Sequence, residues 1–149
     1  MKRFFIDTEF NGFCGRLISM AIVSEDLQNE FYEVLYPETY TANYAGIDPW
    51  VEKNVLPHLN KEPISVSEFQ AKLSKFLCDN SEMGEITIIA DWPEDITHLT
   101  KMMITSPGQM IHSPKRINAI VDRSIEYKSA IEHNALEDAR AIAKSYIIK

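Results

Sequence analysis

Two acidic side chains near the start of the chain have the spacing of metal ligands. Asp7 and Glu9 stand two residues apart at the end of an apolar segment that predicts a strand. Residues i and i+2 of a strand point to the same face, roughly 6.5–7 Å apart, so both carboxylates can share a hard cation. Alone the pattern is a weak signal, because it arises by chance in an acidic chain and a solvated strand end explains it too.

A second acidic segment follows the apolar run Ile86–Ala90, which predicts a buried strand. Asp91 is expected to be the N-cap of the next helix, with Glu94 as its capping-box partner. This places Asp95 at position N4, near the positive end of the helix dipole. We interpret Asp91 and Glu94 as caps and Asp95 as a candidate metal ligand.

A third segment repeats this arrangement before the predicted C-terminal helix. Asn134 is expected to be the N-cap, Glu137 position N3 and Asp138 position N4. His133 then lies just outside the helix, where its ring can turn toward the acid, and a histidine suits a general base near neutral pH. Carboxylates gathered in one place repel one another unless cations lie between them. If the three segments meet, they predict a two-metal phosphodiesterase site.

A mixed sheet would bring the three segments together. The antiparallel start consists of strands Arg3–Ile6, Leu17–Ser24 and Phe31–Tyr36, and the strands Ile86–Ala90 and Ile117–Val121 follow, linked by helices. The expected helices are Ser65–Leu77, Pro93–Met103 and Ala135–Ile147, with a shorter one near Asp48–Asn54 inside a surface loop. This order predicts an α/β fold of ribonuclease H-like type: a mixed five-stranded sheet, order 3-2-1-4-5, flanked by helices.

Composition bounds the class of protein. The 149 residues, 45% of them hydrophobic, predict a single domain over 1–149. The net charge of −7 argues against broad duplex binding but not against a nuclease that meets phosphate through metal ions. Cys14 and Cys78 are expected to be reduced thiols of a cytoplasmic protein, and the sequence predicts neither a signal peptide nor a membrane partner.

The three segments, in this order, resemble the motifs of the DEDDh 3′–5′ exonucleases, the ribonuclease H-like family that includes polymerase proofreading subunits and oligoribonucleases. The motifs are Asp7-Thr8-Glu9, residues 91–95 and residues 133–138, and the nearest resemblance is to small stand-alone exoribonucleases. His133 at the head of the third motif selects the histidine branch of the family. Asn11 and Asp91 replace the usual threonine and asparagine, so Asp91 is an alternative to Asp95, which we prefer because the family acid ends its motif.

The resemblance implies removal of nucleoside 5′-monophosphates from the 3′ end of single-stranded RNA, or of single-stranded DNA, with two Mg²⁺ or Mn²⁺ ions. It implies that Asp7 bridges both ions, that Glu9 and Asp138 hold the ion carrying the nucleophilic water, and that Asp95 holds the second ion. His133 would take the proton from that water. The implied contacts of the substrate are Phe10, Asn11, Gly12, Phe13 and Asp91.

Two other functions use the same residues. A ribonuclease H-type endonuclease has a similar sheet and acids, although the His-x4-Asp motif disfavours it. A non-catalytic module that binds RNA ends is the second alternative. Because family members are often dimers, the resemblance also implies a homodimer, for which the aromatic segment Tyr36–Trp50 could serve as interface.

Three further features are weaker. We expect Trp50 to anchor its loop rather than to contact substrate. The basic-leaning stretch Lys115, Arg116, Arg123 and Lys128 could guide phosphates, although a solvated face is the commoner interpretation. The residues do not decide between RNA and DNA, which differ in the 2′-hydroxyl that loop groups contact.

Overall fold

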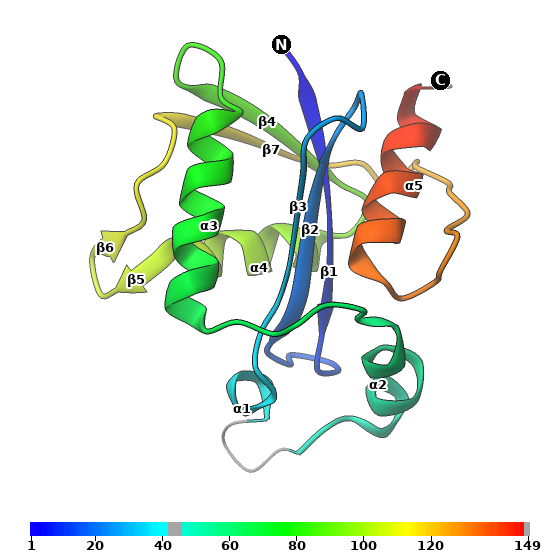
Figure 1. Ribbon diagram of the computed structural model, residues 1–149. Coiled ribbons are helices and arrows are strands. Elements are labelled where there is room, and N and C mark those ends of the chain that lie inside the picture. The colour runs from blue at the N-terminus through cyan, green and yellow to red at the C-terminus, as the bar shows by residue number, and fades with distance from the viewer. Residues whose placement is uncertain (42–45, 148–149) are drawn as a thin grey trace.

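A five-stranded mixed sheet forms the centre of the computed structural model, which describes residues 1–41 and 46–147 (Figure 1). Its strands are β1 (Arg3–Phe10), β2 (Leu17–Ser24), β3 (Glu30–Val34), β4 (Glu85–Ala90) and β7 (Arg116–Val121), in the order β3-β2-β1-β4-β7. β7 is the fifth strand of this sheet along the chain. The predicted ribonuclease H-like order, with the first strand central, is therefore confirmed.

The first three strands form an antiparallel meander. β2 is buried at all eight positions, as its continuous apolar run predicts, because both faces of the sheet are covered there. β1 pairs antiparallel with β2 and parallel with β4. In the parallel pairing, Ile6 of β1 lies beside Ala90 of β4. This parallel pairing brings the end of β1 to the same edge as the segment that follows β4.

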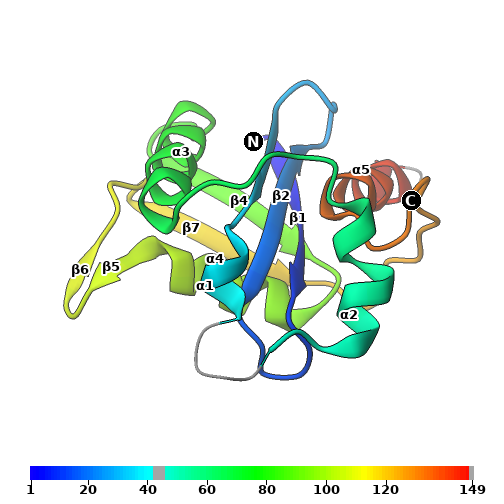
Figure 2. The same cartoon turned by 60° about the horizontal axis from the view of Figure 1, so that its bottom comes forward.

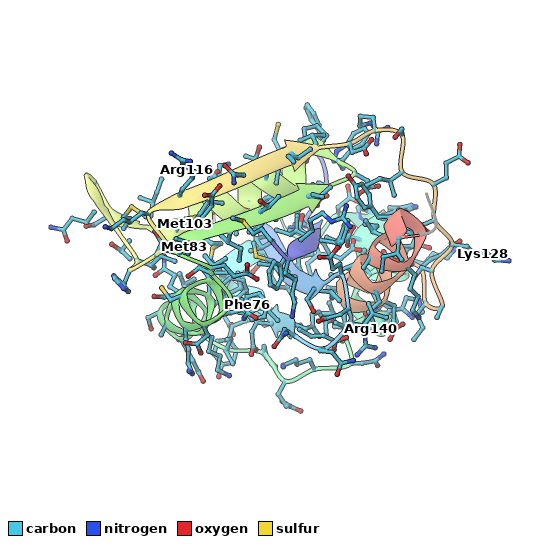
Figure 3. All side chains as sticks on the ribbon, turned by 90° about the horizontal axis from the view of Figure 1, so that it is seen from above. Phe76, Met83, Met103, Arg116, Lys128 and Arg140 are labelled. Carbon is cyan, nitrogen blue, oxygen red and sulfur yellow. The ribbon has the colours of Figure 1, made fainter. Side chains whose placement is uncertain are left out.

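Helices cover both faces of the sheet. Helices α3 (Val66–Asp79) and α4 (Pro93–Met103) pack over the apolar core that contains Phe4, Ile6 and Ile88. Helix α5 (Ala135–Ile147) packs on the opposite face, where its Ile142 meets Phe5; seen from above, α3 and α5 lie on opposite sides of the strands (Figure 3).

The helix boundaries follow from local chemistry. Ser65 caps α3, its Oγ accepting a hydrogen bond from the Glu68 backbone N at 3.2 Å. Val66, in the first turn of this helix, is exposed. α4 and α5 have the predicted bounds.

The connection between β3 and α3 contains the predicted short helix. The connection comprises α1 (Pro37–Tyr40), α2 (Pro49–Asn54) and a 3-10 turn, Leu56–His58, and α2 is the predicted helix. Figure 2 shows α2 beside the start of α5 and near the loop between β1 and β2. Part of the expected dimer segment, residues 42–45, lies outside the described residues.

The sequence did not predict a small hairpin after α4. Strands β5 (Ile104–Ser106) and β6 (Gln109–Met110) pair around Pro107-Gly108 and project from the body (Figures 1 and 2). Strands this short carry no periodic signal in the sequence. None of the helices in the described ranges is long and apolar enough to cross a membrane.

Candidate metal centre

Acidic side chains from all three predicted segments meet at one edge of the sheet. Two groups of three acids have carboxylate oxygens within 4.8 Å of one another: Asp7, Glu9 and Asp138 form one group, and Asp7, Asp91 and Asp95 form the other. Asp7 belongs to both groups. The parallel pairing of β1 with β4 places the first and second segments side by side, and α5, packed against β1, supplies the third.

The capping of α4 differs from the prediction, although the helix spans the predicted range Pro93–Met103. Trp92 occupies the N-cap position, without a side-chain cap, and Pro93 is the first helical residue. Asp91 is therefore not the N-cap, Glu94 is not its box partner, and Asp95 stands at N3 rather than N4. The proline sets the start of the helix one residue later than the acidic pattern suggested, and Asp91 joins the acidic cluster.

Asp95 is held in place by Thr8, the middle residue of the first motif. Its Oδ1 accepts hydrogen bonds from the Thr8 backbone N at 3.0 Å and from the Thr8 Oγ1 at 2.6 Å. Asp91 and Asp95 lie in the same group of acids, so the choice between them as the acid of the second segment is not exclusive. Asp95 is the more buried of the two, and its Oδ2 stays without a hydrogen-bond partner.

His133 lies beside Asp138 but outside α5, as predicted. Asn134 caps the helix, its Oδ1 accepting from the Glu137 N at 3.0 Å. His133 has a left-handed backbone (φ 66°), and its N–H donates to Asp138 Oδ2 at 3.2 Å. The Trp50 ring packs against the His133 ring in an edge-to-face contact with centroids 4.8 Å apart.

Burial and mutual repulsion make these acids hard to ionise. Burial, followed by the neighbouring Asp138 and Asp95, raises the pKa of Glu9 to about 8. Burial raises the pKa of Asp95 to about 7, although the Thr8 hydrogen bonds oppose the shift. Burial also raises the pKa of Asp7, with added repulsion from Asp95, Glu9 and Asp138, and burial raises that of Asp138.

The cluster has unmet capacity for cations. Three buried carboxylate oxygens make no hydrogen bond: Asp7 Oδ2, Asp95 Oδ2 and Asp138 Oδ1. Within residues 1–41 and 46–147, no lysine or arginine forms an ion pair with any of the four predicted acids. All-oxygen carboxylate sites are the type that Mg²⁺ and Mn²⁺ prefer. The residues present therefore fit a divalent metal centre.

A cavity of about 610 Å³ opens over the acids. Of the residues predicted to contact substrate, Phe10, Gly12, Phe13 and Asp91 line this cavity. Asn11 does not line the cavity. Its amide instead braces the surrounding loop, donating to the carbonyls of Tyr40 and Gly46 and accepting from the Asp48 N. Asn11 therefore holds the loop together rather than facing the cavity.

Three aromatic residues that line the cavity, Trp50, Trp92 and Tyr127, were not among the site residues predicted from sequence. Trp50 was expected to anchor its loop rather than to contact substrate; its side chain is 53% exposed, lines the cavity and contacts His133. Tyr127 also lines the cavity, and burial, with Asp7 next, raises the pKa of its hydroxyl. Trp50 follows the Asp48-Pro49 helix start, which gives a weak signal, whereas Tyr127 lies in an irregular segment that gives none.

The basic stretch divides in the structure. Arg123 donates from Nη1 to the Asp91 carbonyl at 2.7 Å, and its guanidinium lies 4.3 Å from the centre of the Trp92 ring. Arg116 pairs with Glu85 at the opposite end of β7. Lys128 points away from the sheet beyond α5 (Figure 3). Only Arg123 is thus tied to a segment of the acidic cluster.

Neither the models of known protein families nor the curated proteins contain a match to this chain. The chemistry of the site consequently rests on its geometry. The two groups of acids, which have Asp7 in common, can hold divalent cations. The histidine and the exposed aromatic rings that line the same cavity can face an anionic substrate that carries aromatic groups.

Proposed function

We propose that the protein is a metal-dependent 3′–5′ exonuclease of the DEDDh type. In this proposal it removes nucleoside 5′-monophosphates from the 3′ end of single-stranded RNA or single-stranded DNA. One observation carries the proposal: two groups of three acids share Asp7 in a cavity that His133 also lines. This is the donor set of a two-metal phosphodiesterase.

Each acid has a role that follows from its position. Asp7 would contact two divalent ions, Glu9 and Asp138 would complete one site, and Asp95, with Asp91 beside it, would complete the other. Bound Mg²⁺ or Mn²⁺ would supply a more acidic water and would neutralise charge on the phosphate. Thr8 fixes the Asp95 carboxylate, and the His133 backbone N–H fixes that of Asp138.

His133 is suited to accept a proton at the rim of this cavity. Its backbone bond to Asp138 sets where the residue stands, and the edge of Trp50 limits how its ring turns. A neutral imidazole at that place can take the proton of the attacking water. The scissile P–O bond breaks on the side of the upstream 3′ oxygen, and a nucleoside 5′-monophosphate leaves.

The terminal base would stack on the aromatic rings near His133. Phe13 is 93% exposed, and it shares the cavity lining with Trp50. Stacking of an unpaired base on an aromatic side chain is worth about 1–3 kcal/mol. Two exposed rings beside an acidic cluster favour a single-stranded end over a paired one.

The test is a time course on 5′-labelled single-stranded RNA and matched DNA with Mg²⁺ or Mn²⁺. Wild type is compared with His133→Ala and Asp7→Asn, and with Glu33→Gln as a folded control outside the cavity. We expect a ladder that shortens from the 3′ end, lost in the first two variants and kept in the third. A circular RNA should stay intact.

Two outcomes would contradict the proposal. Internal fragments, or cleavage of the circle, would favour the ribonuclease H-type endonuclease. Absence of cleavage by folded, metal-loaded protein would favour a module that only binds RNA ends.

A further inference from the structure

A tryptophan and an arginine form a stacked pair at one end of the acidic cavity. Trp92 lines the cavity and is 43% exposed, and the Arg123 guanidinium lies 4.3 Å from its ring centre. Arg123 Nη1 is anchored to the Asp91 carbonyl at 2.7 Å, which leaves most of its five N–H donors for other partners. In the described part of the chain, no acidic side chain forms an ion pair with Arg123.

The cavity has two chemically different ends. At one end, Glu9 leads into the loop that carries Phe13, and His133 meets both Asp138 and Trp50. At the other end, Asp91 leads into Trp92 and holds Arg123 through its carbonyl. Asp7 lies between them, because it belongs to both groups of acids.

A phosphodiester has a nucleoside on each side, so a scissile phosphate at Asp7 needs room at both ends. The end with Trp50 and His133 offers aromatic rings, and no described lysine or arginine stacks on them, although Phe13 shares a neighbouring pocket with Lys101. The end with Trp92 and Arg123 offers a ring and a guanidinium together. The nucleotide on the 5′ side of the scissile bond carries a base and a further phosphate, whereas the 3′-terminal nucleotide has no further phosphate. The upstream nucleotide therefore matches this second end.

We propose that Trp92 and Arg123 bind the nucleotide on the 5′ side of the scissile phosphate, so that the preferred substrate is a single strand rather than a mononucleotide ester. This inference rests on the proposed function. The base stacks against the exposed part of the indole, and the guanidinium pairs with the next phosphate toward the 5′ end. Arginine suits this role because its planar fork binds phosphate oxygens and stacks on aromatic rings while staying charged.

The test compares two substrates that differ only on the upstream side. One is the p-nitrophenyl ester of uridine 5′-monophosphate, in which the aryl leaving group replaces the upstream nucleotide. The other is a five-nucleotide RNA. For Arg123→Gln we expect kcat/KM on the RNA to fall about tenfold, while kcat/KM on the aryl ester changes less than twofold. Arg123→Lys should recover part of the activity on RNA, since it restores the charge without the fork.

Arg116→Gln is the matched control, because it removes the same charge from the start of β7, at the far end of that strand from Arg123 (Figure 3). This substitution should leave kcat/KM on both substrates unchanged. Raising the salt concentration should lower log kcat/KM on RNA less steeply for Arg123→Gln than for wild type, by a slope of about 0.7 for one lost phosphate contact.

Trp92 gives an independent variant. Trp92→Phe keeps a stacking face and should cost less than threefold on RNA, whereas Trp92→Leu should cost about tenfold on RNA and little on the aryl ester. Equal losses on both substrates would overturn the inference, since they would mean that the pair only supports the fold of the site. If wild type cleaves neither substrate, the proposed function itself fails.

Discussion

Two buried acids on this sheet are handled in opposite ways. Glu33 on β3 is 6% exposed, and its Oε1 lies 3.3 Å from the Lys72 ammonium and 3.6 Å from that of Lys61. Asp7 on β1 is 8% exposed, yet its nearest charged neighbours are further carboxylates. Both acids keep one oxygen without a hydrogen bond, so the difference between them lies in charge compensation.

This difference separates an acid that the chain neutralises from acids that it leaves uncompensated. The chain supplies two lysines to Glu33. Around Asp7 the chain gathers acids, and among the described residues no lysine or arginine forms an ion pair with Asp7, Glu9, Asp95 or Asp138, which costs free energy of folding unless protons or metal ions bind. In the proposed function, this cost in stability is offset when metal ions bind in the acidic cavity.

The largest effect should come from neutralising each acid in turn. Asp7→Asn should lower exonuclease activity at least about a thousandfold, or ~4 kcal/mol of transition-state stabilisation, because it removes the acid common to both groups. At pH 8 without metal, the same substitution should raise the melting temperature, since it removes one of several repelling charges. Thermal unfolding and the labelled-RNA assay measure the two effects.

Glu33→Gln is the partner experiment. It should leave activity unchanged and lower the melting temperature by about 2–4 °C, because the loss of a charge pair with exposed lysines is worth about 1 kcal/mol. Melting shifts of the same sign in both variants would contradict the contrast between the two acids.

Metal binding should act on only one of the two regions. Mn²⁺ or Mg²⁺ at a hundred times its dissociation constant adds about 2.7 kcal/mol to the free energy of unfolding, which is roughly 5–10 °C for a chain of this size. We expect this shift in wild type and in Glu33→Gln at pH 8, and its loss in Asp7→Asn, which removes the acid common to both groups. A shift that persists in Asp7→Asn would place the ion elsewhere.

The metal-free protein should lose stability as pH rises from about 5 to 8. The pKa of Glu9 is raised to about 8 and that of Asp95 to about 7. In this window the folded state therefore binds more protons than the unfolded state, and the free energy of unfolding falls with pH. His98, whose pKa burial lowers, acts in the opposite direction, but it is one group against several acids.

Melting temperatures across this range, with and without Mg²⁺, test the expectation. Glu9→Gln should flatten the metal-free curve, and Glu33→Gln should shift it without changing its slope. A melting temperature that climbs steadily from pH 5 to 8 without metal would show that the cluster is not protonated at low pH.

The sequence predicted the sheet well because its signals are local and strong. The apolar run Leu17–Ser24 and the capped helix after Ser65 determine their own structure, and the strand order followed from the succession of elements. The hairpin at β5 and β6 was missed because its strands have three and two residues and bury no apolar stripe.

The site was predicted less completely. Asp7, Glu9, Asp95 and Asp138 stand in recognisable motifs, and they do come together. The mistakes have physical causes. Pro93 rather than Asp91 sets the start of α4, and Asn11 binds its own loop. Tyr127 reaches the cavity from an irregular segment, whose path depends on tertiary packing.

The smallest expected effect concerns Thr8, which orients an acid without neutralising it. Thr8→Val keeps the shape of this buried side chain but removes the 2.6 Å hydrogen bond to Asp95 Oδ1, leaving only the bond from the backbone N. Loss of a group that orients a metal ligand typically costs 10–100-fold in affinity or activity. Because one of the two bonds remains, we expect the lower limit: about a tenfold higher Mn²⁺ concentration for half-maximal activity, with kcat at saturating metal nearly unchanged.

Thr8→Ser, which retains the hydroxyl, should stay within about threefold of wild type in the same titration. Equal behaviour of the valine and serine variants would mean that the backbone N–H alone positions Asp95. The contrast with Glu33 explains why a hydroxyl stands here instead of a lysine. A lysine would satisfy Asp95 by neutralising it and would compete with the cation, whereas a hydroxyl holds one oxygen in place and leaves the negative charge to the metal.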